Sequence, residues 1–149
     1  MRLTIDLSDK HAYALMHACE VLARCGMGQF KMLADSLIPW QTANQTGIDA
    51  LEGTASRHTR VDGFEEMAKL LLMPELYRGG YWAMHNKKVP ATCQLAWEVY
   101  SALRHAAAWA RLAAEGRTEP EFHGCQYDQP MSVSGEPMPT VAVALEDVP

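Results

Sequence analysis

The chain has 149 residues, of which 48% are hydrophobic and 21% charged, and its formal net charge is −5. This length and composition predict a single globular domain, residues 1–149, whose core is large enough to fold without disulfide bonds or a structural metal. The negative charge argues against a general nucleic-acid-binding protein, because such a protein needs a basic face to displace counterions from phosphates.

The beginning of the chain carries acidic residues early, which is not typical of a signal peptide. The longest apolar runs, such as Leu70–Met73, are too short to cross a bilayer. No two of the four cysteines form a CxxC pair. We therefore expect reduced thiols, no membrane association and a cytoplasmic location.

The first element expected is a half-buried strand, because Leu3, Ile5 and Leu7 alternate with polar residues. Ser8 then has the character of a helix N-cap, and Asp9 follows in the first turn, where the helix dipole favours an anion. Apolar residues continue at helical spacing and predict a first helix that ends at Gly26; they are Ala12, Leu15, Met16, Cys19, Leu22 and Ala23.

A second, short helix is expected from Gln29 to the residues before Pro39, since the residue before a proline is pushed out of the helical region. The polar stretch 40–60 has weak periodicity and predicts a long loop with one helical turn around 48–51. The sequence DGFE at 62–65 has capping-box spacing, which predicts the start of a third helix that stops near Pro74.

The longest helical pattern runs from Pro90 to Glu115, with Gly116 as its C-terminal stop. One broad face of this central helix is apolar and rich in alanine, which allows another helix to approach closely; it comprises Leu95, Val99, Ala102, Leu103, Ala106, Ala110 and Ala113.

The stretch after Gly116 is rich in proline and glycine, and Val141, Val143 and Leu145 then alternate as in a strand. Two such strands need partners, so we expect the two ends of the chain to pair. The expected fold class is α+β and mainly helical: three to four helices around the long central helix, with a small antiparallel sheet made from the N- and C-terminal strands.

Motifs that carry catalysis are missing from the sequence, which has no Walker loop, GxSxG, HExxH or GxGxxG. His123 and Cys125 offer two soft ligands, but a single HxC without a second pair predicts no metal site. These observations favour a non-enzymatic protein, and we assign no catalytic residue, metal ligand or cofactor.

The sequence GMGQ at 26–29 allows two interpretations. Gly26 can form a left-handed C-cap, and Gly28 can turn the chain into the next helix. Alternatively, the start of that next helix exposes N–H donors that hold an anion, with the side chains of Arg24 and Gln29 alongside.

The side of the central helix opposite its alanine face carries Trp97 and Arg104, and His105 and Trp109 lie on its flank. One interpretation is that other segments, such as the proline-rich C-terminal stretch, cover this side. The other is a binding face, because tryptophan, tyrosine and arginine dominate interface energetics. The preceding sequence GGYWAMH adds further candidates to that face, namely Tyr81, Trp82 and His85.

Three stretches in order along the chain, MGQF, YWAMHNKKVP leading into AWEVYSALRHAAAW, and YDQPMSVSGEPMPTV, resemble a family of small, mostly uncharacterised proteins encoded by tailed bacteriophages. The likeness is weakest across 42–60. It implies a setting, the cytoplasm of an infected bacterial host, and it implies no mechanism.

The leading hypothesis is a non-enzymatic phage accessory protein, for host takeover or anti-defence, that sequesters a small anionic, nucleotide-like signal. Arg24, Gln29 and the GMG backbone would hold phosphate, while Trp82, Trp97 or Trp109 stacks on a base.

Two alternatives stay open. One is a protein–protein module that self-associates as a homo-oligomer or masks a host enzyme. The other is a small hydrolase of a phosphorylated signal, which requires His85 and His105 to converge with an acid such as Asp128 or Glu98.

Overall fold

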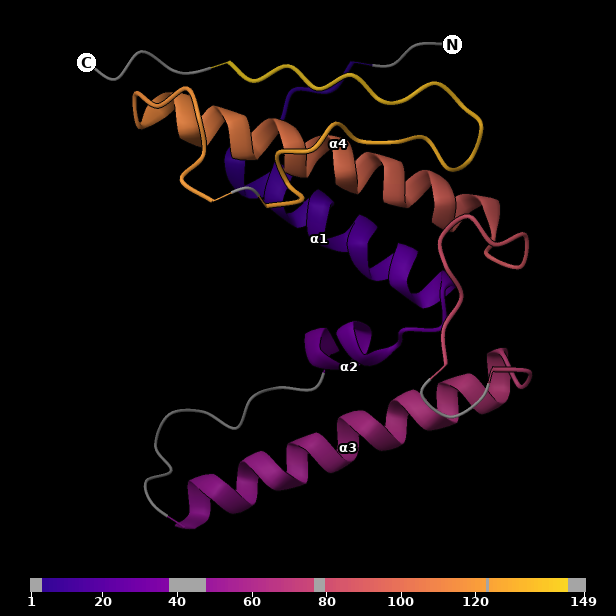
Figure 1. Cartoon of the computed structure of the whole chain (residues 1–149). Coiled ribbons are helices and arrows are strands. Elements are labelled where there is room, and N and C mark those ends of the chain that lie inside the picture. Colours follow the sequence, from indigo (N-terminus) through magenta and orange to yellow (C-terminus); the bar gives the residue numbers. More distant parts are fainter. Residues whose placement is uncertain (1–3, 38–47, 77–79, 123, 145–149) are drawn as a thin grey trace. The chain divides into compact units, whose positions relative to one another are not determined.

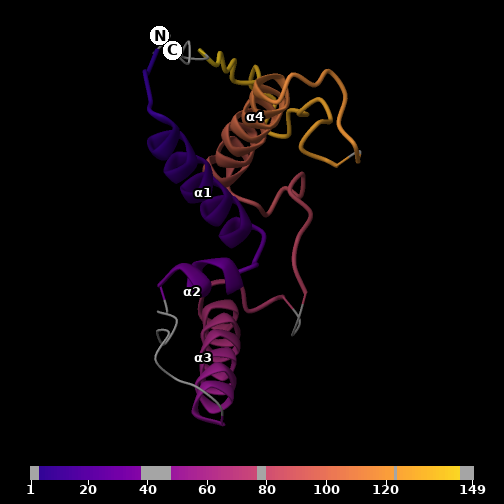
Figure 2. The same cartoon turned by 90° about the vertical axis from the view of Figure 1, so that its left-hand side faces the viewer.

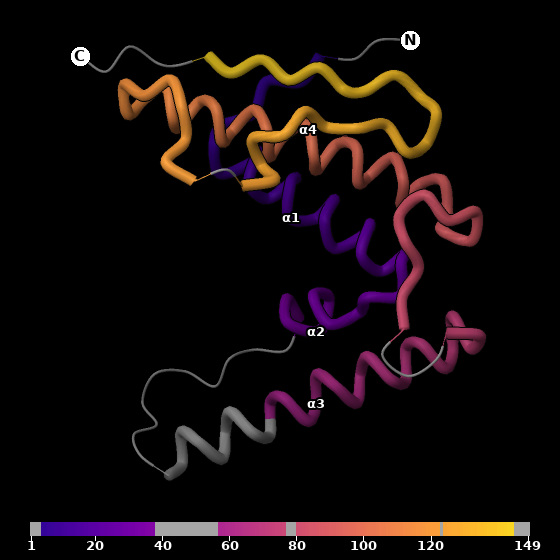
Figure 3. Tube along the Cα trace, in the orientation of Figure 1, coloured from indigo at the N-terminus to yellow at the C-terminus, as the bar shows by residue number. Residues whose placement is uncertain are grey.

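The computed structural model describes residues 4–37, 48–76, 80–122 and 124–144, and within residues 48–76 it describes side chains from Arg57 onward (Figure 3). The chain, which we predicted as one domain, forms two compact units. The first combines Met1–Ala23 with Pro90–Pro149, and the second is Arg24–Val89.

Every regular element in the described residues is a helix: α1 (Asp9–Gly26), α2 (Lys31–Leu37), α3 (Ile48–Leu72) and α4 (Ala91–Ala114) (Figure 1). The predicted α+β class with a terminal antiparallel sheet is therefore wrong, since 4–8 and 141–144 form no strand. Ile5 is 62% exposed and Val143 is 48% exposed. Alternation marks an extended segment, but a strand also needs a neighbouring edge with which to pair.

The first unit is built on α4, with α1 on one side and the loop that opens the C-terminal segment, residues 117–144, on the other (Figure 2). α1 begins as predicted, since the carbonyl of Ser8 accepts a hydrogen bond from the Ala12 amide at 2.9 Å. The Tyr100 hydroxyl of α4 contacts the Glu20 carboxylate of α1. Ala23 is completely buried, and Ala12, Met16 and Cys19, which lie on the same side of α1, are half-buried.

The buried face of α4 is the one that carries Trp97 and Arg104. Its buried side chains surround these two residues at helical spacing and include Cys93, Ala96, Tyr100, Ser101, Ala108 and Leu112. On the alanine-rich face, Leu95 is 41% exposed, whereas Ala102 is buried. The C-terminal segment covers part of this side, as the first interpretation expects, because it forms hydrogen bonds with Glu98 and Arg104. The binding face stays a prediction. The helix ends as expected, because Gly116 adopts the left-handed conformation with φ +68°.

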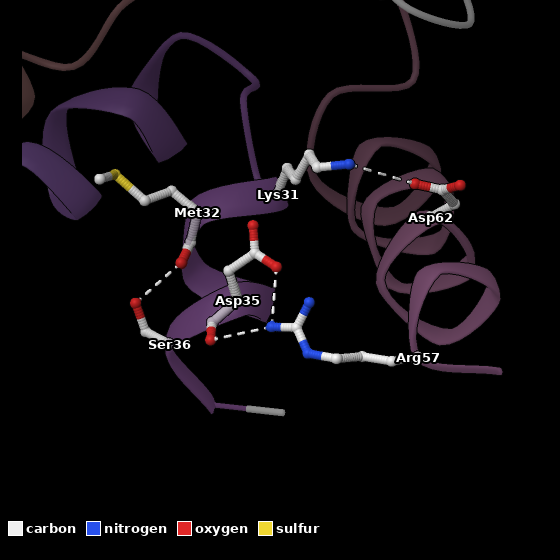
Figure 4. A network of polar contacts seen from close by, with 6 residues as sticks. All are labelled: Lys31, Met32, Asp35, Ser36, Arg57 and Asp62. Atoms are coloured by element: carbon white, nitrogen blue, oxygen red, sulfur yellow. Dashed lines mark hydrogen bonds and ion pairs between the residues drawn. The ribbon is translucent and has the colours of Figure 1, made fainter. Parts of the chain in front are cut away.

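The second unit packs α2 against α3. α2 begins two residues after the predicted Gln29, and its predicted end before Pro39 falls outside the described residues. Its Ala34, the preceding Phe30 and Val61 of α3 are all buried. Ion pairs flank this core (Figure 4). Arg57 Nη2 lies 2.8 Å from Asp35 Oδ1 and also donates to the Asp35 carbonyl oxygen at 3.3 Å.

Two predictions about α3 are wrong. The stretch 48–60, expected to be mainly loop, is the first half of α3, and the expected helix start at Asp62 lies in its middle; residues 38–47 lie outside the described part. The apolar period is weak there because Arg57, only 5% exposed, occupies a position that normally carries an apolar side chain. Helix propensity and an ion pair hold a helix that hydrophobic periodicity does not reveal.

Candidate functional site

The glycine corner after α1 is a Schellman motif. The Gln29 amide donates to the Arg24 carbonyl at 2.8 Å, and the Gly28 amide donates to the Cys25 carbonyl at 2.9 Å. The left-handed residue is Gly28, with φ +87°, and not Gly26 as predicted, because Gly26 still belongs to the last turn of α1. This is the six-to-one and five-to-two pattern of a helix C-cap. The amides of Met27, Gly28 and Gln29 are therefore occupied by the C-cap. The N–H donors predicted to hold an anion are those at the start of α2, and that anion site stays a prediction.

The side chains around the corner make their own contacts. Arg24 Nη1 donates to Gln29 Oε1 at 2.9 Å. The Trp82 amide donates to the Met27 carbonyl at 2.9 Å, and the Lys88 ammonium lies 5.4 Å from the centre of the Trp82 ring. The structure thus joins Trp82 to the glycine corner. The neighbouring Tyr81 and His85 are exposed, Tyr81 by 63%.

The other predicted residues belong to the first unit, where Arg104 links α4 to the C-terminal segment. Arg104 Nη1 donates to the Tyr100 hydroxyl at 3.2 Å, and its Nη2 donates to the Cys125 carbonyl at 3.3 Å. The guanidinium lies 5.0 Å from the centre of the Tyr100 ring, and Trp97 packs against the same ring. Burial is the main reason that the pKa of Tyr100 is raised. These contacts give Arg104 and Trp97 a structural role.

His105 and Trp109 continue the same packing. Their rings are 6.2 Å apart, and the Trp109 ring meets Tyr127 of the C-terminal segment edge-on at 5.5 Å. Trp109 is 37% exposed, so only its outer part is accessible. The predicted site residues therefore fall into two sets, one in each unit, and the hypothesis that they line one hollow stays a prediction.

Glu98, a candidate acid in the hydrolase hypothesis, is 1% exposed and anchors the C-terminal segment. Its Oε1 accepts hydrogen bonds from the Val133 amide at 2.7 Å, the Ser134 amide at 2.8 Å and the Ser132 hydroxyl at 2.9 Å. Its Oε2 accepts one from the Ser134 hydroxyl at 2.9 Å. Gly135, with φ +86°, turns the chain directly after these donors.

Burial by itself raises the pKa of Glu98, but the amides of Ser134 and Val133 and the hydroxyls of Ser134 and Ser132 outweigh it. The pKa of Glu98 is consequently held below its ordinary value. A carboxylate that is buried, ionised and fully hydrogen-bonded is poorly placed to take a proton from a substrate. Its chemistry is that of a structural anchor.

A surface that sequence analysis missed lies on α3. Four large apolar side chains share one side of its last three turns, which we call the α3 stripe: Phe64, Met67, Leu70 and Leu71, exposed by 38%, 56%, 66% and 71%. A shallow hollow of about 480 Å³ shares Leu70 with the stripe, and its other lining residues carry charges of both signs or are apolar: Asp62, Glu65, Glu66, Lys69, Pro74 and Leu76. The signal was present in GFEEMAKLLLM, whose apolar residues are too many for the single face that packs on α2.

The structure offers little support for other kinds of site. All four cysteines are free thiols, and no group of three or more metal-ligating side chains occurs in the described ranges. None of the helices, as far as the structure describes them, has the length and apolar character needed to span a membrane.

No protein family, curated protein or solved structure matches the chain.

Proposed function

We propose that this chain is a non-enzymatic binding protein that recognises a protein partner through the α3 stripe. The observation that carries the proposal is the stripe itself, which gathers large apolar side chains on one helix face. Single exposed apolar residues are ordinary, but a contiguous group marks an interaction surface. α3 already packs on α2 near the completely buried Val61, and the side chains of the stripe stay exposed next to that contact.

The hollow that shares Leu70 with the stripe adds charged groups of both signs at the edge of this surface. Apolar anchors supply most of the binding energy, while a charged rim tunes orientation and selects partners. Asp62 and Glu65 also pair with Lys31 and Lys69, which holds part of the rim in place. The finer assignment, a phage accessory protein for host takeover or anti-defence, follows from the sequence resemblance and stays a prediction.

Sequestration of a nucleotide-like anion stays a prediction as well. Its best support is in the second unit, where Trp82 adjoins the glycine corner and a lysine lies over its ring. The occupied amides of the corner remove the backbone donors on which that hypothesis partly depended. The protein-binding proposal therefore accounts for more of what the structure describes.

The test compares Met67→Asp with Tyr13→Asp, a matched control on α1, because both native side chains are 56% exposed. Proteins retained from a bacterial extract by the wild-type chain are identified, purified and titrated against all three chains by calorimetry. We expect Met67→Asp to weaken binding by roughly tenfold or more, since it places a carboxylate where an apolar side chain is buried. Tyr13→Asp is expected to bind normally. Equal affinity of the wild type and Met67→Asp for every such protein would contradict the proposal.

A further inference from the structure

Within the described residues, the hydrogen-bond partners of Arg104 in α4 are all neutral. Its Nη1 donates to the Tyr100 hydroxyl and its Nη2 donates to the Cys125 carbonyl. No carboxylate in the part of the chain that the structure describes forms an ion pair with it. The Glu20 carboxylate of α1 contacts the Tyr100 hydroxyl instead. Because Arg104 is half-buried, its charge would gain much from an anionic partner.

One edge of this guanidinium has little to bind. The Nε–H and one Nη2–H point in the same direction and form the fork with which an arginine holds a carboxylate or a phosphate through two parallel hydrogen bonds. The Nε of Arg104 is buried and has no hydrogen-bond partner among the described residues. The bond from Nη2 to the Cys125 carbonyl measures 3.3 Å, which is long for an N–H···O bond. One neutral oxygen therefore lies where two oxygens of an anion fit.

The carbonyl at this edge belongs to a turn, residues 124–127, whose attachment to the helix is weak. Inside the turn, the Tyr127 amide donates to the Gly124 carbonyl at 2.9 Å. The Tyr127 ring meets Trp109 edge-on, and Trp109 also contacts the ring of His105, whose Nδ1 is a second buried nitrogen without a partner in the described residues. No backbone–backbone hydrogen bond joins the turn to a helix in the described part of the chain. The turn can therefore leave the guanidinium without breaking a helix.

From these observations we infer that the Nε and Nη2 edge of Arg104 is a binding site for an oxyanion, a phosphate or carboxylate group, which enters by displacing the Cys125 carbonyl. The Tyr100 hydroxyl holds Nη1, so the fork is oriented before the anion arrives. The C-terminal segment competes with the anion, because Glu98 holds residues 132–134 of that segment on the same helix. This site belongs to the first unit and is separate from the α3 stripe of the second.

The experiment titrates the full-length chain with sodium phosphate and, separately, with sodium acetate, at constant ionic strength, and follows the amide resonances of residues 124–127 by NMR. We expect saturable shifts with at least one of the two anions, at a dissociation constant of about 1–10 mM, and the two titrations tell phosphate from carboxylate. Arg104→Gln should weaken binding roughly tenfold or more, because glutamine offers no charged fork. Arg111→Gln removes the same charge from an exposed position of the same helix and should leave binding unchanged.

Glu98→Gln gives a second readout, which does not depend on the folding of Arg104→Gln. It loosens residues 132–134 and keeps the partners of Arg104 in place, so the competing segment is displaced more easily. The anion should then bind several-fold more tightly than to Glu119→Gln, which removes the same charge from an exposed position.

Three results would overturn the inference. They are equal affinities of the wild type and Arg104→Gln, an equal loss in Arg111→Gln, and an affinity of Glu98→Gln no higher than that of Glu119→Gln. A wild type that shows no saturation with either anion up to about 100 mM would overturn it as well. Each of these results leaves the proposed function standing, because that function is tested by Met67→Asp in the other unit.

Discussion

Glu98 lies in the middle of a helix and is almost completely buried, and its hydrogen-bond donors come from residues 34 to 36 positions further along the chain. In the sequence, a glutamate of this kind is indistinguishable from a solvated surface residue. The roles of Ser132 and Ser134 as donors to Glu98 are equally hard to predict, because both serines lie in a stretch rich in proline and glycine. A carboxylate satisfied by two amides and two hydroxyls needs no cation, so no charge pattern reveals it.

Replacing Glu98 by Gln should destabilise the first unit by about 2 kcal/mol, because hydrogen bonds to a charged acceptor are stronger and the side-chain NH2 cannot accept from Ser134. The measurement is urea unfolding at neutral pH, with Glu119→Gln as the exposed control.

The same residue predicts a pH dependence. The pKa of Glu98 is lowered by folding, so its contribution is present above the pKa of the unfolded chain and is lost as the pH falls through the folded pKa. Wild type should lose stability over the acid range below the ordinary value of 4.5. Glu98→Gln should lose less over that range, and identical acid profiles of the two chains would contradict the anchoring role.

Among the helices, α3 is the one whose first half the sequence pattern did not predict, because that half carries mainly polar residues. The capping-box spacing at 62–65 predicted a start that the structure does not have, because the same spacing also occurs inside helices. What extends α3 back to Ile48 is not a visible apolar face. In this first half of α3, the buried Arg57 pairs with Asp35 of α2. Because Asp35 belongs to a different helix, the local sequence around Arg57 does not reveal this contact.

A double-mutant cycle on Arg57→Met and Asp35→Asn should give a coupling free energy of about 1–2 kcal/mol, since Arg57 is buried and the pair is close. A parallel cycle on Lys31 and Asp62, which lie 3.7 Å apart and are both largely exposed, should give less than about 0.5 kcal/mol. The free energies come from chemical denaturation. Equal coupling in the two pairs would show that the buried contact does not bring α2 and α3 together.

For the molecule as a whole, the C-terminal segment takes the place of the sheet that we expected. It runs along α4 in an irregular path (Figure 1) and is held by Glu98, Arg104 and Trp109 through side-chain contacts. An extended chain can satisfy its polar groups on a helix in this way and then needs no partner strand.

Removal of residues 119–149 should therefore uncover the Trp97 and Arg104 side of α4. We expect a lower melting temperature, stronger binding of an apolar dye and a shift in tryptophan fluorescence as Trp109 loses Tyr127. A synthetic peptide covering 119–144 should reverse the fluorescence shift in the wild-type background and not with Glu98→Gln. A shortened chain with unchanged melting and fluorescence would contradict the covering role.

Local chemistry along the chain was enough to place most helix ends. Ser8, Gly28, Pro90 and Gly116 act through their own backbone preferences or through bonds to residues a few positions away, so their effect is readable without a fold. The central helix and the short α2 were predictable for the same reason.

Three features were decided only by contacts between distant segments. They are the buried face of α4, the absence of strands in the described parts of the termini, and the length of α3. Each depends on a partner many residues away: Ser132–Ser134 for Glu98, Cys125 for Arg104 and Asp35 for Arg57. The energy of burying a polar group is set by that partner and not by the group's neighbours in sequence. The exposed α3 stripe is of the same kind, because apolar residues become a surface only once the other face of their helix has been covered.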